Sequence, residues 1–136
     1  MANEKILLVV TPSVQSGELT AAAHGLKLQD SRLRIVVPAI AKSAMSFWMS
    51  DEKSISDARS TAEQAGVELN DHAWSVEASA GDSDPVIAVE DAIKTFGPDR
   101  VLVVRRHRSN GYKASKLERI NEMLNRSVEH HLVGVA

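Results

Sequence analysis

The sequence contains no cysteine, and aromatic residues make up only 4 % of it. The absence of cysteine excludes disulfides, thiolate zinc sites, cysteine-ligated iron–sulfur clusters and thiol catalysis. A long hydrophobic run is also missing, because Pro38 and Lys42 interrupt the most apolar window, Ile35 to Met49. A membrane span needs about 20 apolar residues. The apolar stretch Ile6 to Val10 is too short for a signal peptide, so we expect a cytoplasmic protein.

The 136 residues carry a formal net charge of -2, with 43 % hydrophobic and 25 % charged residues. These proportions are typical of a soluble globular domain, and the length favours a single domain over residues 1–136. A near-neutral total argues against a protein that coats DNA, although it leaves room for a local basic site.

Short aliphatic runs alternate with amphipathic segments along the chain. Four β-branched or leucine-rich runs predict strands that are covered on both faces: Ile6 to Val10, Leu33 to Val37, Val101 to Val104, and Leu132 to Val135. A weaker run, Ala73 to Ala78, predicts a half-exposed strand near an edge, with Trp74 and Val76 on alternating positions.

Between these runs, helical spacing of apolar residues predicts four helices: Glu18 to Leu28, Asp51 to Ala65, Pro85 to Phe96, and Ser115 to Val128. Gly66 is expected to end the second helix and Gly97-Pro98 the third. Strands that alternate with helices predict a doubly wound, five-stranded parallel sheet with helices on both faces and right-handed crossovers.

One long irregular connection, residues 38–50, contains the apolar residues Met45, Phe47, Trp48 and Met49. These side chains either fold back onto the core or form a lid or partner-binding loop. Trp48 and Trp74 could stack on a flavin, but both are expected in the core.

The near-neutral total hides an internal contrast in charge. Residues 100–119 contain seven Lys or Arg and a single acid, whereas residues 77–99 contain six acids and one Lys. In a doubly wound sheet, ligands bind beyond the carboxyl ends of the strands where the strand order reverses. If the first and fourth strong runs flank that reversal, the loop 11–17 and the basic loop 105–114 meet there.

The crevice predicted at this point combines hydroxyls, cationic side chains, a glycine and the N-terminus of the last helix, which together suit a phosphate or another anion. The candidate binding residues are Thr11, Ser13, Arg105, Arg106, Arg108, Ser109, Gly111, Lys113 and Ser115. The alternative interpretation is a solvated basic turn. Nucleic-acid binding is less favoured, because Tyr112 alone is a poor stacking platform.

Other groups of residues give weaker support for a functional site. His130 and His131 are adjacent on a predicted strand and point to opposite faces, which disfavours a shared metal ion. His24 is expected at the surface or hydrogen-bonded. The loop Thr11 to Ser16 weakly resembles the phosphate loop of flavodoxins, but Pro12 lacks an amide that such a loop needs. A flavodoxin-like redox protein is therefore a lower-ranked alternative. No local signature supports a catalytic triad.

The order of these segments resembles the universal stress protein family over nearly the whole chain. The similarity is carried by five segments: Lys5 to Val10, Val36-Val37-Pro38, Gly81-Asp82-Ser83-Asp84-Pro85, Asp99 to Val104, and Leu132 to Val135. The resemblance implies a Rossmann-like fold of the adenine nucleotide alpha hydrolase kind with strand order 3-2-1-4-5. It also implies a homodimer through the last strand, Leu132, Val133 and Val135, which is apolar and needs a partner at an edge.

Family members that bind ATP carry a glycine motif after the fourth strand and an acidic residue after the first. Here Thr11 stands in place of the acid, and Arg105 and Arg108 stand near two of the glycine positions. Side chains at these positions block the close approach of the backbone to phosphate, so arginine side chains would have to hold an anion instead.

We therefore expect a divergent, non-enzymatic, universal stress protein-like protein that holds phosphate or an adenine nucleotide in a modified site, or no ligand. The alternative is a protein-interaction module that uses Phe47, Trp48 and Met49 without nucleotide.

Overall fold

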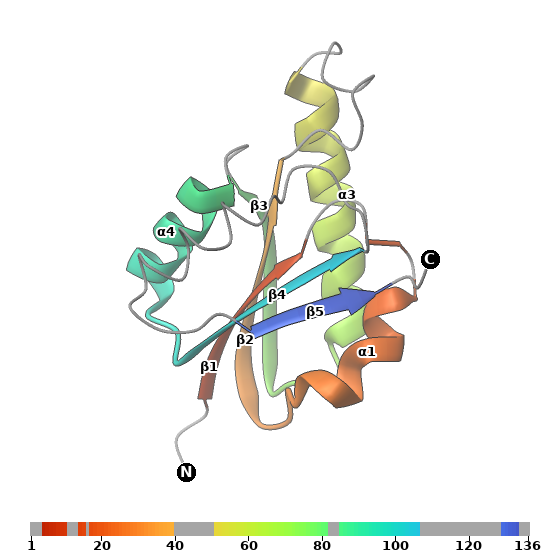
Figure 1. Ribbon diagram of the computed structural model, residues 1–136, viewed down its shortest axis with the longest axis vertical. Coiled ribbons are helices and arrows are strands. Elements are labelled where there is room, and N and C mark those ends of the chain that lie inside the picture. Colours follow the sequence, from red (N-terminus) through yellow and green to blue (C-terminus); the bar gives the residue numbers. More distant parts are fainter. Residues whose placement is uncertain are drawn as a thin grey trace.

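The computed structural model describes residues 4–10, 14–15, 17–39, 51–81, 85–106 and 129–133. Strands and helices alternate through these ranges (Figure 1). In chain order the elements are β1 (Glu4–Val10), α1 (Glu18–Leu26), β2 (Ser31–Pro38), α3 (Asp51–Leu69), β3 (Ser75–Gly81), α4 (Pro85–Phe96), β4 (Arg100–Arg106) and β5 (Glu129–Val133). No helix in these ranges is long and apolar enough to span a membrane.

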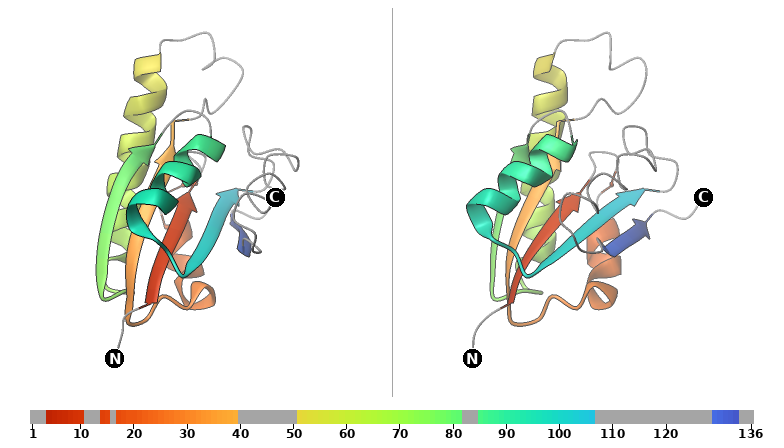
Figure 2. Two further views of the ribbon diagram at one scale, coloured as in Figure 1. Left: turned by 90° about the vertical axis from the view of Figure 1, so that its left-hand side faces the viewer. Right: turned by 60° about the vertical axis from the view of Figure 1, so that its left-hand side comes forward.

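The strands form one parallel sheet in the order β3-β2-β1-β4-β5. The predicted order of the first four strands, 3-2-1-4, is confirmed. β5 follows on the outer side of β4, where its backbone pairs from Glu129, opposite Leu102, to Val133, opposite Arg106. The sheet is strongly twisted, as Figures 1 and 2 show, and this is the ordinary right-handed twist of parallel strands.

Alternation along each strand divides the core between the two faces of the sheet. On β1, Ile6, Leu8 and Val10 lie in one buried cluster and Leu7 and Val9 in the other. The first cluster is covered by α1 and α3, and the second by α4. Figure 2 shows α4 on one side of the sheet and α1 and α3 on the other. Helices on both faces are the arrangement that the strand–helix alternation predicts.

Helix α3 is longer than the sequence predicts. Gly66 does not end it, and the helix continues to Leu69, which is fully buried. A Cβ on Gly66 would lie 3.4 Å from the Cβ of Ala78 on β3, which is an ordinary contact distance, so the glycine is not required by the packing of helix against strand. Burial of Leu69 outweighs the modest cost of a glycine inside a helix.

Helix α4 has the bounds that the sequence predicts. It begins at Pro85 and ends at Phe96, followed by Gly97 with a φ of 63° and by Pro98. A positive φ suits glycine, and proline cannot continue the helix. The turn into β4 is attached to β1, because Lys5 N–H donates to Asp99 Oδ2 over 2.9 Å and Asp99 N–H donates to the carbonyl of Lys5 over 2.7 Å.

Strand β3 is an outer strand of the sheet, in agreement with the prediction of a half-exposed strand near an edge. It is shifted by two residues from the predicted range and begins at Ser75. Trp74 therefore lies just before the strand, and it is 66 % exposed instead of buried in the core. No element on the outer side of β3, within the described ranges, covers this side chain.

Candidate functional site

The reversal of strand order lies between β1 and β4. The chain runs from β1 outward to β2 and β3, then crosses to the other side of β1 to form β4. Val10 of β1 is paired with Val104 of β4, so the carboxyl ends of these two strands are neighbours at one edge of the sheet. This is the position at which doubly wound sheets place their ligands.

Arg105 and Arg106 are the last two residues of β4, and their backbones pair with Leu132 and Val133 of β5. The structure thus places two of the candidate residues at the reversal point. Seven others lie outside the described ranges: Thr11, Ser13, Arg108, Ser109, Gly111, Lys113 and Ser115. The candidate partner residues Phe47, Trp48, Met49 and Val135, and the predicted helix Ser115 to Val128, also lie outside them.

The β1 side of the reversal point leads into α1. Val14 is buried in the core beneath α1, and Gly17, with a φ of 85°, turns the chain into the helix. Glu18 stands in the first turn, where its Oε1 accepts a hydrogen bond from the N–H of Gln15. An acidic side chain there is favourable for the helix dipole and repels a bound anion.

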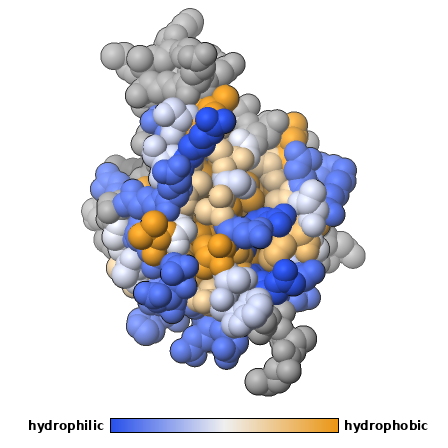
Figure 3. Space-filling model, turned by 180° about the vertical axis from the view of Figure 1, so that it is seen from behind, coloured by the Kyte–Doolittle hydropathy of each residue, from blue (hydrophilic) through white to orange (hydrophobic). Residues whose placement is uncertain are grey.

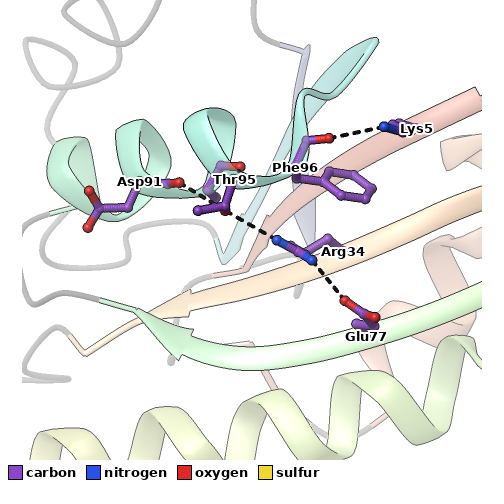
Figure 4. A network of polar contacts seen from close by, with 7 residues as sticks. Lys5, Arg34, Glu77, Asp91, Thr95 and Phe96 are labelled. Atoms are coloured by element: carbon purple, nitrogen blue, oxygen red, sulfur yellow. Dashed lines mark hydrogen bonds and ion pairs between the residues drawn. The ribbon is translucent and has the colours of Figure 1, made fainter.

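A cluster that the sequence analysis did not single out lies between β2, β3 and α4 (Figure 4). Arg34 donates from Nη1 to Thr95 Oγ1 over 3.2 Å and from Nη2 to Glu77 Oε2 over 2.9 Å. Its guanidinium also stacks on Phe96, 4.7 Å from the ring centroid. With a side chain only 28 % exposed, Arg34 connects the helix to both strands. The sequence does contain a signal for it, a single Arg inside the aliphatic run Leu33 to Val37.

Beside Arg34 lies an open hollow of about 350 Å³ between α4 and the outer two strands. Its polar lining includes Ser79, Asp91 and Thr95. The guanidinium faces three protein groups already, so its role in the structure is to hold α4 against the sheet. On the outer surface of α4, a hydrogen bond from Lys94 to Glu90, together with the charge of Glu90, raises the pKa of Lys94.

The opposite end of the sheet has a second hollow, of about 490 Å³, beside the turns that precede β2 and β3. His24 and His72 line it, with their ring centroids 6.3 Å apart in an edge-to-face contact. His24 is exposed, as the sequence predicts. In the part of the chain that the structure describes, no group of three or more His, Asp or Glu side chains is arranged to hold a metal ion.

No family model and no curated protein matches the sequence. Comparison of the structure with solved structures finds a crystal structure of a protein from the universal stress protein family of Burkholderia pseudomallei. The alignment has a TM-score of 0.50 and covers 92 % of this chain and 93 % of that chain, at 17 % sequence identity. The fold is similar to that of a universal stress protein. At this identity the similarity concerns the fold alone.

The universal stress protein-like fold also bears on the lower-ranked alternative. Flavodoxins have the strand order 2-1-3-4-5, in which the third strand lies next to the first. Here β1 lies between β2 and β4, and β3 is an outer strand. The hypothesis of a flavodoxin-like protein is therefore wrong, because the chain crosses over β1 at a different step.

Proposed function

We propose that this chain is a cytoplasmic, non-enzymatic, universal stress protein-like protein that binds phosphate or the phosphates of an adenine nucleotide. The ligand would lie at the carboxyl ends of β1 and β4. The observation that supports this most directly is the position of Arg105 and Arg106, which end β4 at the point where the strand order reverses. Ligands of doubly wound sheets bind at that point, and arginine suits phosphate.

The proposed mode of binding differs from that of a glycine-rich phosphate loop. Arginine side chains would contact the anion from the β4 side, since residues 105, 106 and 108 are arginines where flexible glycines would let the backbone approach. Glu18 on the β1 side adds a negative charge. We therefore expect modest affinity, and a preference for phosphate groups over the base.

Thermal unfolding with millimolar ATP, ADP, AMP or inorganic phosphate tests the proposal. We expect these ligands to raise the midpoint of unfolding, because a ligand that binds only the folded state stabilises it. The double variant Arg105→Ala/Arg108→Ala should lose this shift. The matched control is Arg32→Ala/Arg59→Ala, which removes two exposed arginines from other parts of the structure and changes the net charge equally.

Two outcomes would count against an anion site. One is the absence of any shift with millimolar ligand, which leaves a protein without nucleotide. The other is an equal loss of the shift in both double variants, which would indicate a general effect of positive charge.

The proposal includes a homodimer through β5. It is supported by the position of β5 next to β4, away from the other strands, and by the apolar residues Leu132 and Val133 in its sequence. An apolar outer strand associates readily with another strand. Interaction through the 38–50 loop stays a separate prediction.

A further inference from the structure

The hollow beside the turns that precede β2 and β3 is lined by four side chains of the types that bind metal ions. These are His24, Asp30, Asp71 and His72, and the hollow has a volume of about 490 Å³. Among the residues that the structure describes, no protein group forms a hydrogen bond or an ion pair with any of the four side chains. Their nitrogen and oxygen atoms are therefore available to a ligand.

The turns that surround the hollow are held in fixed positions at the lower end of Figure 1. In the turn from α1 to β2, the N–H and the hydroxyl of Ser31 both donate to the carbonyl of Leu28. In the turn from α3 to β3, the N–H of His72 donates to the carbonyl of Leu69 over 2.9 Å. The N–H of Trp74 donates to the carbonyl of Ser31 over 2.8 Å and so joins the two turns. The backbone on both sides of the hollow is therefore positioned before any ligand binds.

The two imidazole rings are close enough to share one metal ion. Their centroids are 6.3 Å apart, and the rings meet edge to face at an angle of 82°. A zinc–nitrogen bond is about 2.0–2.1 Å long, so two rings bound to one ion have centroids within roughly 6 Å of each other. Rotation of the exposed His24 side chain is sufficient to close the remaining distance, because exposed side chains change rotamer readily. One ion would then link α1 to the turn before β3.

The charge of the hollow favours a cation over an anion. Asp30 and Asp71 contribute two carboxylates, whereas Lys27 contributes one ammonium group. Figure 3, which shows the molecule from behind, has hydrophilic residues along this lower end, below the apolar middle of that face. A concave site with an excess of negative charge raises the local concentration of cations.

We propose that this hollow binds one Zn²⁺ ion, or a divalent ion of similar ligand preference, through the imidazoles of His24 and His72. Imidazole suits Zn²⁺, Ni²⁺ and Cu²⁺, whereas Mg²⁺ and Ca²⁺ prefer oxygen ligands. The described residues contain no third side chain arranged to bind the same ion. Water would complete the coordination, and Asp30 or Asp71 would accept hydrogen bonds from that water. With two protein ligands instead of the three or four of a dedicated zinc site, the ion should be exchangeable.

This metal site is separate from the anion site proposed above. The hollow lies at the end of the sheet where β2 and β3 begin, whereas Arg105 and Arg106 lie where β4 ends. Zinc binding can therefore be measured without phosphate or nucleotide. Its presence or absence does not change the expected response to those anions.

Calorimetric titration of the full, untagged chain with zinc chloride, in a buffer without phosphate, tests the proposal. We expect the tightest site to bind one ion per chain, and an equal concentration of Mg²⁺ should not compete for it. His24→Gln and His72→Gln should each weaken binding by about tenfold or more, because the second imidazole acts as an intramolecular ligand only while the first is present. The double variant should lose little more than either single variant, since residues that act as a unit are not additive.

The histidines of β5 provide a matched control. His130 and His131 are adjacent on this strand, and His130→Gln/His131→Gln removes as many imidazoles as His24→Gln/His72→Gln does. The control should leave zinc affinity unchanged. Asp71→Asn should weaken binding by about threefold, as expected for an exposed charge contact.

Nuclear magnetic resonance of the imidazole nitrogens in the wild type gives a readout that needs no variant. The signals of His24 and His72 should shift together as zinc is added, before those of the other histidines. The proposal would be overturned if these two signals did not move, or if the control variant lost as much affinity as His24→Gln/His72→Gln. Small losses that simply add between the two single variants would also overturn it, because they would indicate two independent ions. Equal affinity for Mg²⁺ would assign binding to the carboxylates instead of the imidazoles.

Discussion

The two faces of the sheet are built differently, although the same strands supply both. In the ranges described, α1 and α3 cover a buried cluster of eighteen residues, whereas α4 covers a cluster of eight. The larger cluster is almost purely aliphatic. The smaller one is supplemented by Arg34, which stacks on Phe96 and joins β2 and β3 to α4. Among the described residues, one face is thus packed by aliphatic side chains alone, whereas the other combines aliphatic packing with a partly exposed polar network.

Two adjacent leucines on β1 provide the strongest test of this comparison. Leu7 and Leu8 are both fully buried, but Leu8 belongs to the larger cluster and Leu7 to the smaller. Leu8→Ala should lower the free energy of unfolding by about 4–5 kcal/mol, because a rigid core leaves most of the cavity unfilled. Leu7→Ala should cost about 2–3 kcal/mol, since among the described residues fewer buried side chains belong to its cluster. Urea unfolding measures both.

The pair controls for strand, residue type and exposure, so the two values can be compared directly. Equal losses, or a larger loss in Leu7→Ala, would show that the two faces contribute alike. The far-UV circular dichroism of each variant should match that of the wild type, which confirms that the loss reflects packing and not a change of fold.

Two glycines, one on each face, should respond with opposite sign to the same substitution. A Cβ on Gly81 would lie 2.9 Å from Val36 Cγ1 and 3.0 Å from Ala88 Cβ, so Gly81→Ala forces α4 away from the sheet. We expect a loss of about 1–3 kcal/mol from this overpacking. A Cβ on Gly66 would lie 3.4 Å from Ala78 Cβ, an ordinary contact. Gly66→Ala should therefore stabilise the protein by about 0.5–1 kcal/mol, since alanine favours a helix interior.

Thermal unfolding of the two variants under identical conditions is sufficient to determine the signs. A midpoint that rises in Gly81→Ala would mean that α4 accommodates a methyl group without moving. A midpoint that falls in Gly66→Ala would mean that α3 cannot move by a few tenths of an ångström from β3.

Much of the fold could be predicted from the sequence, because its signals are local. Aliphatic runs such as Ile6 to Val10 predict buried strands, and the Pro85 and Gly97-Pro98 signals predict both ends of α4. The prediction was wrong where packing between distant segments determines the end of a helix or the exposure of a side chain. Gly66 lies inside α3 because the helix continues past it to the buried Leu69, and Trp74 is exposed because β3 is an outer strand. Neither the length of α3 nor the exposure of Trp74 can be predicted from the local sequence.

The candidate anion site could be predicted only in its position. The strand order places Arg105 and Arg106 beside the carboxyl end of β1, as the charge contrast of the chain suggests. All seven remaining residues predicted for the site lie outside the described ranges, so their role stays a prediction. The Arg34 cluster was missed because its partners, Glu77 and Thr95, are 43 and 61 residues away along the chain. Only the fold brings them together.

Arg34 provides the smallest and most specific test of the polar face. Arg34→Met keeps much of the side-chain stem but removes the stacking on Phe96 and the hydrogen bonds to Glu77 and Thr95. We expect a loss of about 1 kcal/mol, which combines a cation–π contact with a partly exposed ion pair. Arg34→Lys should recover only a small part, because lysine lacks the planar fork.

Salt separates the two contributions of Arg34. At about 1 M salt the Debye length falls to about 3 Å, so an exposed ion pair is screened. The ion pair with Glu77 is therefore weakened, while the stacking on Phe96, on a side chain that is only 28 % exposed, is affected less. Most of the loss in Arg34→Met should persist in urea unfolding at high salt. A loss that disappears there would assign the whole effect to the Glu77 pair, and the polar network would then contribute to the position of α4 only through charge.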